Sequence, residues 1–154
     1  MIVVGKNAAP LDWDQARKLQ KIMPRAILLT DEEYLNLVPK TKEVTFVNKT
    51  IKNTILFSIG GPVANKFTEK INDKLPQPFR AINGELVLTK LKPDEGAIQV
   101  LVVNQTVYDP LRDINYVLDK WVCVLAGNWR QGTERATNEL LKMPEIRSNI
   151  ILIG

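Results

Sequence analysis

Three glycine-containing loops carry the residues of this sequence that could bind a ligand. They are Gly60-Gly61-Pro62, Gly127-Asn128-Trp129 and Gly5-Lys6-Asn7, and each follows an apolar run and precedes a helical pattern. Such a loop can hold a phosphate or another small anion, because its backbone N–H groups and the positive end of the following helix attract negative charge. The candidate ligand-binding residues are Gly60, Gly61, Asn65, Gly127, Asn128, Thr133, Lys6 and Asn7.

Each loop also has a structural explanation. The Gly60-Gly61 pair fits neither glycine pattern of nucleotide-binding loops, and Pro62 has no backbone N–H to donate. On this interpretation the glycines permit a tight turn between a strand and a helix, and Asn65 hydrogen-bonds the loop. Thr133 would cap the last helix, and Lys6 with Asn7 would lie in a solvated loop. The sequence leaves both interpretations open.

Composition restricts the catalytic chemistry that remains. The chain has no histidine and a single cysteine, Cys123, which excludes histidine-dependent triads, HExxH zinc sites and intramolecular disulfides. Cys123 lies inside an apolar run, as is typical of an inert core thiol. The acidic pairs and runs, Asp12 with Asp14 and the segment 31–33, lie where first helical turns are expected, and there they stabilise the helix dipole. These assignments favour a protein that is not an enzyme, with no catalytic or metal-binding residues and no cofactor, and they leave metal-assisted chemistry at the loop edge open.

The charge of the chain disfavours nucleic acid as a partner. Lys and Arg number 21 against 17 Asp and Glu, for a formal net charge of +4, and they are dispersed along the sequence. Nucleic-acid-binding proteins usually gather basic residues on one face or in one run. No segment has the roughly 18 apolar residues of a membrane span, so membrane insertion is not expected. The N-terminus has no signal-peptide pattern, so the chain as written is expected in the cytoplasm, and the sequons at Asn48 and Asn104 would matter only on an exported protein.

Apolar runs alternate with helical patterns along most of the chain. The sequence predicts strands at residues 2–4, 26–30, 53–59, 121–126 and 150–153, and helices at residues 11–23, 32–37, 63–75, 109–118 and 134–142. This alternation indicates a single α/β domain spanning residues 1–154, with a mostly parallel sheet and helices on both of its faces. The strand–glycine loop–helix units would place all three loops at the carboxyl ends of their strands, the edge at which open α/β sheets bind ligands.

Two of the predicted helices have apolar faces that can be assigned from spacing. The inner face of the helix at 11–23 is expected to hold Ala16, Leu19, Gln20 and Met23, and that of the helix at 63–75 to hold Val63, Phe67, Ile71 and Leu75. Thr133 is expected just before the last helix, where its hydroxyl can bond the free N–H groups of the first turn.

The stretch at about 77–103 departs from the alternation. Asn83-Gly84, the strongest short hairpin pattern in the chain, stands between the segments 79–82 and 85–91. A strongly apolar strand is predicted at 97–103. We expect an antiparallel hairpin or meander here, inserted in the main sheet or added to its edge. Segment 44–52 alternates between apolar and polar residues, which indicates an edge strand or a loop crossing the surface.

Segment 58–65, Ser-Ile-Gly-Gly-Pro-Val-Ala-Asn, resembles the GGPxxN signature of archaeal surface-layer (S-layer) proteins, where it follows a strand and opens a helix. The opening segment 2–9, with Asp12 and Ala16 in the next helix, is similar to the first strand-loop-helix unit of the same proteins. Segment 124–129, followed by Thr133 and Ala136, resembles their closing element. The resemblance follows the order of the chain and is weakest at 76–118.

The resemblance implies an α/β domain that is also similar to the cell-wall-binding repeats of bacterial surface proteins, and it brings no catalytic residues. The leading hypothesis is therefore a non-enzymatic interaction or assembly module, whose partner is another protein or a second copy of the chain. The resemblance implies a cell-surface location only if the chain is exported by other means or is an excised domain. The alternative is a small-molecule or nucleotide-binding protein that holds an anion with the glycine loops at the carboxyl edge of the sheet.

Overall fold

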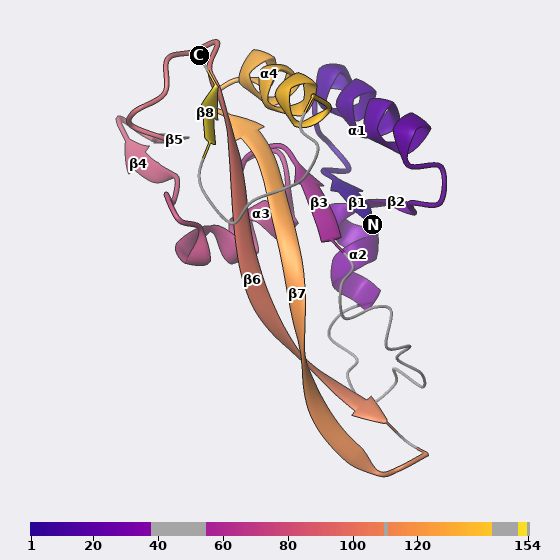
Figure 1. The fold of residues 1–154 in the computed structure, drawn as a ribbon. Helices are drawn as coiled ribbons and strands as arrows, with labels where there is room; N and C mark the ends of the chain where they lie inside the picture. The colour runs from indigo at the N-terminus through magenta and orange to yellow at the C-terminus, as the bar shows by residue number, and fades with distance from the viewer. Residues whose placement is uncertain (38–54, 110, 143–150, 154) are drawn as a thin grey trace.

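Six strands form one sheet in the order β2-β1-β3-β7-β6-β8 (Figure 1). The computed structural model describes residues 1–37, 55–109, 111–142 and 151–153, with backbone alone at 103–109, 116–120 and 151–153. The strands are β1 Ile2–Val4, β2 Leu28–Thr30, β3 Ile55–Ile59, β6 Gly96–Asp109, β7 Ile114–Gly127 and β8 Ile151–Ile153. The helices are α1 Pro10–Ile22, α2 Asp31–Leu37, α3 Lys66–Ile71 with the short 3-10 helix η2 Asn72–Lys74, and α4 Arg130–Leu140.

The sheet is mostly parallel, as the sequence predicts. Strands β2, β1, β3 and β7 all run parallel, and β6 runs antiparallel to its neighbours β7 and β8. Helices α1 and α4 contribute to the core on one face, and α2 and α3 contribute to the core on the other. Because both faces of the central strands are covered, apolar side chains are needed on both, and these strands read as continuous apolar runs.

Strand β1 shows how the two cores share the sheet. Ile2 and Val4 pack on one face in a cluster that includes Leu19 of α1. Val3 packs on the opposite face in a cluster that includes Phe67 of α3. All three β1 side chains are fully buried, and their alternation follows the two-residue period of a strand. A slip of β1 by one residue would turn each of these side chains to the opposite face of the sheet.

The hairpin predicted at Asn83-Gly84 is confirmed. Strand β4 (Arg80–Ile82) pairs antiparallel with β5 (Glu85–Val87) in a small sheet of its own. Asn83 and Gly84 have φ angles of 51° and 80°, as a two-residue turn between right-twisted strands requires. The second strand is shorter than the segment 85–91 suggests. The apolar strand predicted at 97–103 is present in the main sheet as part of β6, whereas the hairpin, expected within that sheet or at its edge, is separate from it.

The helix predicted at 109–118 is wrong. Strand β6 continues to Asp109, a turn follows, and β7 begins at Ile114, so the segment 114–118 is strand. Residues 111–113, which the sequence assigns to the first turn of that helix, lie in the turn between β6 and β7, and Asp113 there has a φ of 51°. Asp and Pro favour both helix starts and turns. The β-branched and aromatic residues of segment 114–118 favour a strand.

Helix α3 begins at Lys66 rather than at Val63. The side chain of Asn65 accepts hydrogen bonds from the backbone N–H groups of Phe67 and Thr68 and so defines the helix start. Val63 lies in the preceding turn and is 82% exposed. It therefore does not belong to the apolar face, whereas the other three predicted members of that face are buried.

Helix α4 begins at Arg130, four positions before the predicted start. Thr133 is therefore not the capping residue. It lies inside the helix and is buried, and Trp129 occupies the N-cap position without a capping side-chain hydrogen bond. The predicted cap failed because Gly132 sits within the helix, where a glycine is disfavoured.

The inner face of α1 also differs from the prediction. Its buried residues are Asp12, Gln15, Ala16 and Leu19, whereas Gln20 is only partly buried and Met23 lies just beyond the helix. The two polar residues Asp12 and Gln15 occupy positions that an apolar pattern would not assign to the core. The buried set is thus the predicted set displaced by four residues, about one helical turn, toward the N-terminus.

Segment 44–52, for which an edge strand or a surface loop is predicted, lies outside the described residues, as does the sequon at Asn48. None of the helices in the described ranges is long and apolar enough to cross a membrane. The strand predicted near the C-terminus is present as β8.

Candidate functional site

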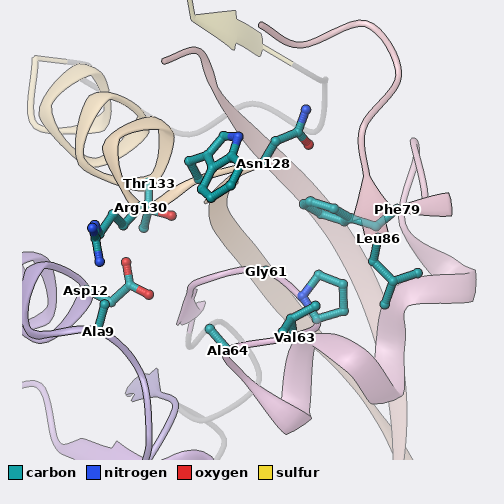
Figure 2. A pocket seen from close by; sticks show the side chains of 13 residues that line it. Ala9, Asp12, Gly61, Val63, Ala64, Phe79, Leu86, Asn128, Arg130 and Thr133 are labelled. Atoms are coloured by element: carbon teal, nitrogen blue, oxygen red, sulfur yellow. The ribbon is translucent and has the colours of Figure 1, made fainter. Parts of the chain in front are cut away.

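A pocket of about 270 Å³ lies where the loops after β3 and β7 meet the start of α1 (Figure 2). We call it the edge pocket, and it is lined by Ala9, Asp12, Gly61, Pro62, Val63, Ala64, Phe79, Leu86, Gly127, Asn128, Trp129, Arg130 and Thr133. Strand β1 has its sequence successor β2 on one side and β3 on the other. The chain therefore changes direction across the sheet here, which is the place where open α/β sheets form ligand crevices.

Asp12 lies in the first turn of α1 and is only 3% exposed. Its Oδ1 atom has no hydrogen-bond partner among the described residues. Burial raises the pKa of this carboxyl to about 6, although the positive charge of Arg130 acts in the opposite direction. A buried carboxylate without a donor is costly in the folded state. Asp12 is therefore ready to accept hydrogen bonds from a group that enters the pocket.

Arg130 is the first residue of α4 and lies on the same side of the edge pocket as Asp12 (Figure 2). Its side chain is exposed and forms no hydrogen bond or ion pair with any residue in the described part of the chain. Its charge lowers the pKa of Asp12, yet the two groups do not form a salt bridge. The edge pocket thus holds two opposite charges that are close without being in contact.

The far side of the edge pocket is apolar. Phe79 and Leu86 face Asp12 and Arg130 across the opening (Figure 2), and Phe79 is buried. Pro62 and Val63 add apolar surface from the loop after β3. A molecule with one charged end and one apolar end would match this division.

Gly60, Gly61 and Asn65 contribute to the site in different ways. Gly60 has a φ of 99°, and a Cβ atom there would lie 3.3 Å from Asp12 Oδ2, so it shapes the loop beside the carboxylate. Gly61 lines the pocket. Asn65 is buried, and besides capping α3 its amide nitrogen donates to the Val3 and Ile59 carbonyls and the Ser58 hydroxyl. Its polar atoms are therefore engaged in holding the loop to β1 and β3.

The start of α3 offers little to an anion. The backbone N–H of Lys66 donates to the Asp31 carboxylate at 2.8 Å, and those of Phe67 and Thr68 donate to Asn65. The preceding N–H groups, of Ala64 and Asn65, donate to the Gly61 carbonyl. These donors are already satisfied, which favours the structural explanation of the Gly60-Gly61 loop over phosphate binding.

Asn128 also has a structural role. Its side-chain oxygen accepts from the Leu88 N–H at 2.7 Å, and its amide nitrogen donates to the carbonyls of Leu88 and Leu91. It thereby ties the segment after β5 to the loop after β7. Gly127 permits a close approach, since a Cβ atom there would lie 2.6 Å from the Glu95 carbonyl oxygen. Thr133, buried in α4, lines the pocket beside Asp12 (Figure 2).

Lys6 and Asn7 do not line the edge pocket. The Lys6 backbone N–H donates to Asp31 Oδ1, and its ammonium group pairs with Glu32 at 3.3 Å. Lys66 pairs with the same Glu32 carboxylate at 3.0 Å, and the two cations lower the pKa of Glu32. Asn7 is exposed. The first glycine loop is thus joined to α2 and to the start of α3, on the other face of the sheet.

The sequence analysis missed Asp12 and Arg130 as site residues. The helix dipole accounts for Asp12, and from the sequence Arg130, in the loop after Gly127, is expected only as a group that could hydrogen-bond a partner. One pattern could have identified Asp12: it stands at the i position of the i, i+3, i+4, i+7 set completed by Gln15, Ala16 and Leu19, all of which are buried. An aspartate in phase with a buried face requires a partner or a ligand.

The remaining reactive group is inert. Cys123 lies in the middle of β7 and is fully buried, and burial raises the pKa of its thiol to about 12. This confirms the expected core thiol. In the described ranges, no three His, Cys, Asp or Glu residues are grouped so as to hold a metal ion.

The chain matches no known protein-family model, and no curated protein matches it. The edge pocket itself combines a buried carboxylate, a guanidinium without a hydrogen-bond partner among the described residues, and an apolar wall.

Proposed function

We propose that this chain is a non-enzymatic assembly module that associates with further copies of itself through the outer half of the β6–β7 hairpin. The outer half comprises the backbone pairs from 103 with 120 to 109 with 114, and we call it the arm. The ordered resemblance of segments 2–9, 58–65 and 124–129 to archaeal S-layer domains supports the same function. Surface layers are arrays built from repeated copies of a chain, and such arrays need a contact that extends from one copy to the next.

The observation that carries the proposal is the length of the arm. Strand β3 pairs with β7 only at Trp121–Leu125, and β8 pairs with β6 only at Gly96–Ile98. Among the described strands, the seven residue pairs of the arm therefore pair only with each other. At about 3.3 Å per residue the arm reaches roughly 20 Å past the sheet, and Figure 1 shows it extending away from the helices.

A two-stranded ribbon of this kind is at best marginally stable in water. Within the described part of the chain its outer edges have no strand partner, and such edges are templates for another strand. Its tip exposes two apolar side chains, Leu111 at 82% and Ile114 at 47%, beside the exposed Arg112 and Asp113. Association with a second copy would cover the tip and pair an edge. The exposed tip and the strand edges of the arm therefore favour self-association over a role as a monomer.

Sedimentation velocity of the full chain at increasing concentration tests the proposal. We expect the weight-average mass to rise with concentration. Leu111→Glu places a charge at the tip and should weaken the association constant by about tenfold, which corresponds to about 1.4 kcal/mol. Ile22→Glu is the matched control, because Ile22 is an exposed apolar residue at the end of α1, and it should leave association unchanged. A chain that stays monomeric at every concentration would contradict the proposal.

A further inference from the structure

The edge pocket contains a charge arrangement that assembly through the arm does not explain. Asp12 is nine-tenths buried, lines the pocket and has an oxygen without a donor. A carboxylate of this kind is usually bonded to another part of its protein. Here the described residues supply no such bond, and a donor on a bound molecule would complete it.

Arg130 is the second charged group that lines the edge pocket. Its guanidinium could neutralise Asp12 directly, but the two side chains form no salt bridge, and Arg130 has no other polar partner among the described residues. An uncommitted guanidinium is suited to binding a carboxylate through two parallel hydrogen bonds. A ligand carboxylate could therefore pair with Arg130 while a ligand donor pairs with Asp12.

The size and the far wall of the pocket limit the rest of the ligand. The volume of about 270 Å³ falls just below the roughly 300–1,000 Å³ of sites for drug-sized molecules, so a ligand of amino-acid size fits. Phe79 and Leu86 lie opposite the two charges (Figure 2). A short apolar group directed at them would lose its contact with water.

We propose that the edge pocket binds a small zwitterion, an α-amino acid with an apolar side chain. Its ammonium group donates to Asp12, its carboxylate accepts from Arg130, and its side chain packs against Phe79 and Leu86. Trp129, which is 55% exposed and lines the pocket, supplies an aromatic surface beside the ammonium group. A simple anion such as phosphate would satisfy Arg130 but would be repelled by Asp12. This proposal does not depend on self-association.

Calorimetric titration of the full chain with four compounds at neutral pH tests the assignment. L-Leucine carries both charges, isoamylamine lacks the carboxylate, 4-methylpentanoate lacks the ammonium group, and inorganic phosphate lacks the apolar group. We expect leucine to bind at least about tenfold more tightly than either single-charge analogue. We expect phosphate not to compete with it. Absence of leucine binding, or tighter binding of phosphate, would overturn the proposal.

Two substitutions assign the charges. Asp12→Asn should weaken leucine binding at least about tenfold without weakening 4-methylpentanoate binding, because Asp12 only repels that anion. Arg130→Gln should weaken leucine binding without weakening isoamylamine binding, because Arg130 only repels that cation. Arg130 is exposed, so its variant tests the site even if the Asp12 variant were to misfold. Arg135→Gln is the control, because Arg135 lies on the same helix but pairs with Asp94 at 2.9 Å. Equal leucine affinity in all three variants would refute the assigned contacts.

Discussion

Asp12 combines two properties that oppose each other at the scale of a single residue. It lies in the first turn of a helix, where a negative charge is stabilised by the dipole, and it is buried without a donor for Oδ1. Burial has the larger effect, because the pKa rises from 3.8 to about 6. The folded chain therefore holds this proton more tightly than the unfolded chain does. Retention of such a destabilising group is common at binding sites.

The raised pKa of Asp12 makes the stability of the fold depend on pH. Asp12 favours folding below its unfolded pKa, and the contribution is lost as the pH rises through about 6. Asp12→Asn cannot ionise, so above about pH 7 it should be more stable than the parent by at most about 3 kcal/mol, with little difference below about pH 4. Urea denaturation at a series of pH values measures this difference. A parent that is the more stable chain at high pH would contradict the burial argument.

Asn65 shows how one side chain positions whole elements. Its oxygen caps α3, and its nitrogen bonds the carbonyls at the ends of β1 and β3. The same amide therefore sets the helix start, the loop between strand and helix, and the spacing of two parallel strands. Of these features, the loop between β3 and α3 lines the edge pocket, through residues 61–64.

The element-scale prediction is that Asn65→Ala destabilises the fold by at least about 4 kcal/mol. The loss combines a helix cap, worth about 1 kcal/mol, with buried carbonyl and hydroxyl groups left without their donor, at roughly 1–3 kcal/mol each. Chemical denaturation monitored by circular dichroism gives the value. Asn7→Ala removes an exposed asparagine and should change the free energy of unfolding by less than about 0.5 kcal/mol. Equal effects of the two substitutions would show that the amide network is not what holds the loop.

At the scale of the whole molecule, β7 connects the two surfaces for which we propose different roles. Its carboxyl end at Gly127 lines the edge pocket, and its start at Ile114 lies beside the tip of the arm. The strand is fourteen residues long, so the two surfaces are roughly 45 Å apart along it. The proposed ligand binding at the pocket would therefore not block the proposed association at the arm.

Hydrogen exchange can locate the association surface on the intact molecule. If the arm is completed by a second copy, amides of residues 103–109 and 114–120 should exchange more slowly as the concentration rises, since they gain partners or lose access to water. Amides of β3 should not change, because that strand is already paired on both sides. Protection that appears at α1 and α4 instead of the arm would show that association uses a different surface.

The sequence alone was sufficient for the fold class because burial on both faces imposes a pattern that local reading can detect. Val3 needs a core on one side and Ile2 and Val4 a core on the other, so the strand is continuously apolar. Asn83-Gly84 was predictable for a local reason, since both residues need positive φ. The segment 109–118 was mispredicted because turn and helix-start residues are the same types, and its strand is specified by pairing with β6.

The sequence by itself determined the alternation of strands and helices, the hairpin, and the exclusion of histidine chemistry. Only the tertiary structure decided which of the loop residues line the same pocket. It assigned Asn65 and Asn128 to hydrogen bonds within the fold, placed Lys6 with Glu32, and brought Asp12 and Arg130 together from opposite ends of the chain. The reason is that hydrophobic periodicity is a local property, whereas the environment of a charge depends on which distant elements bury it.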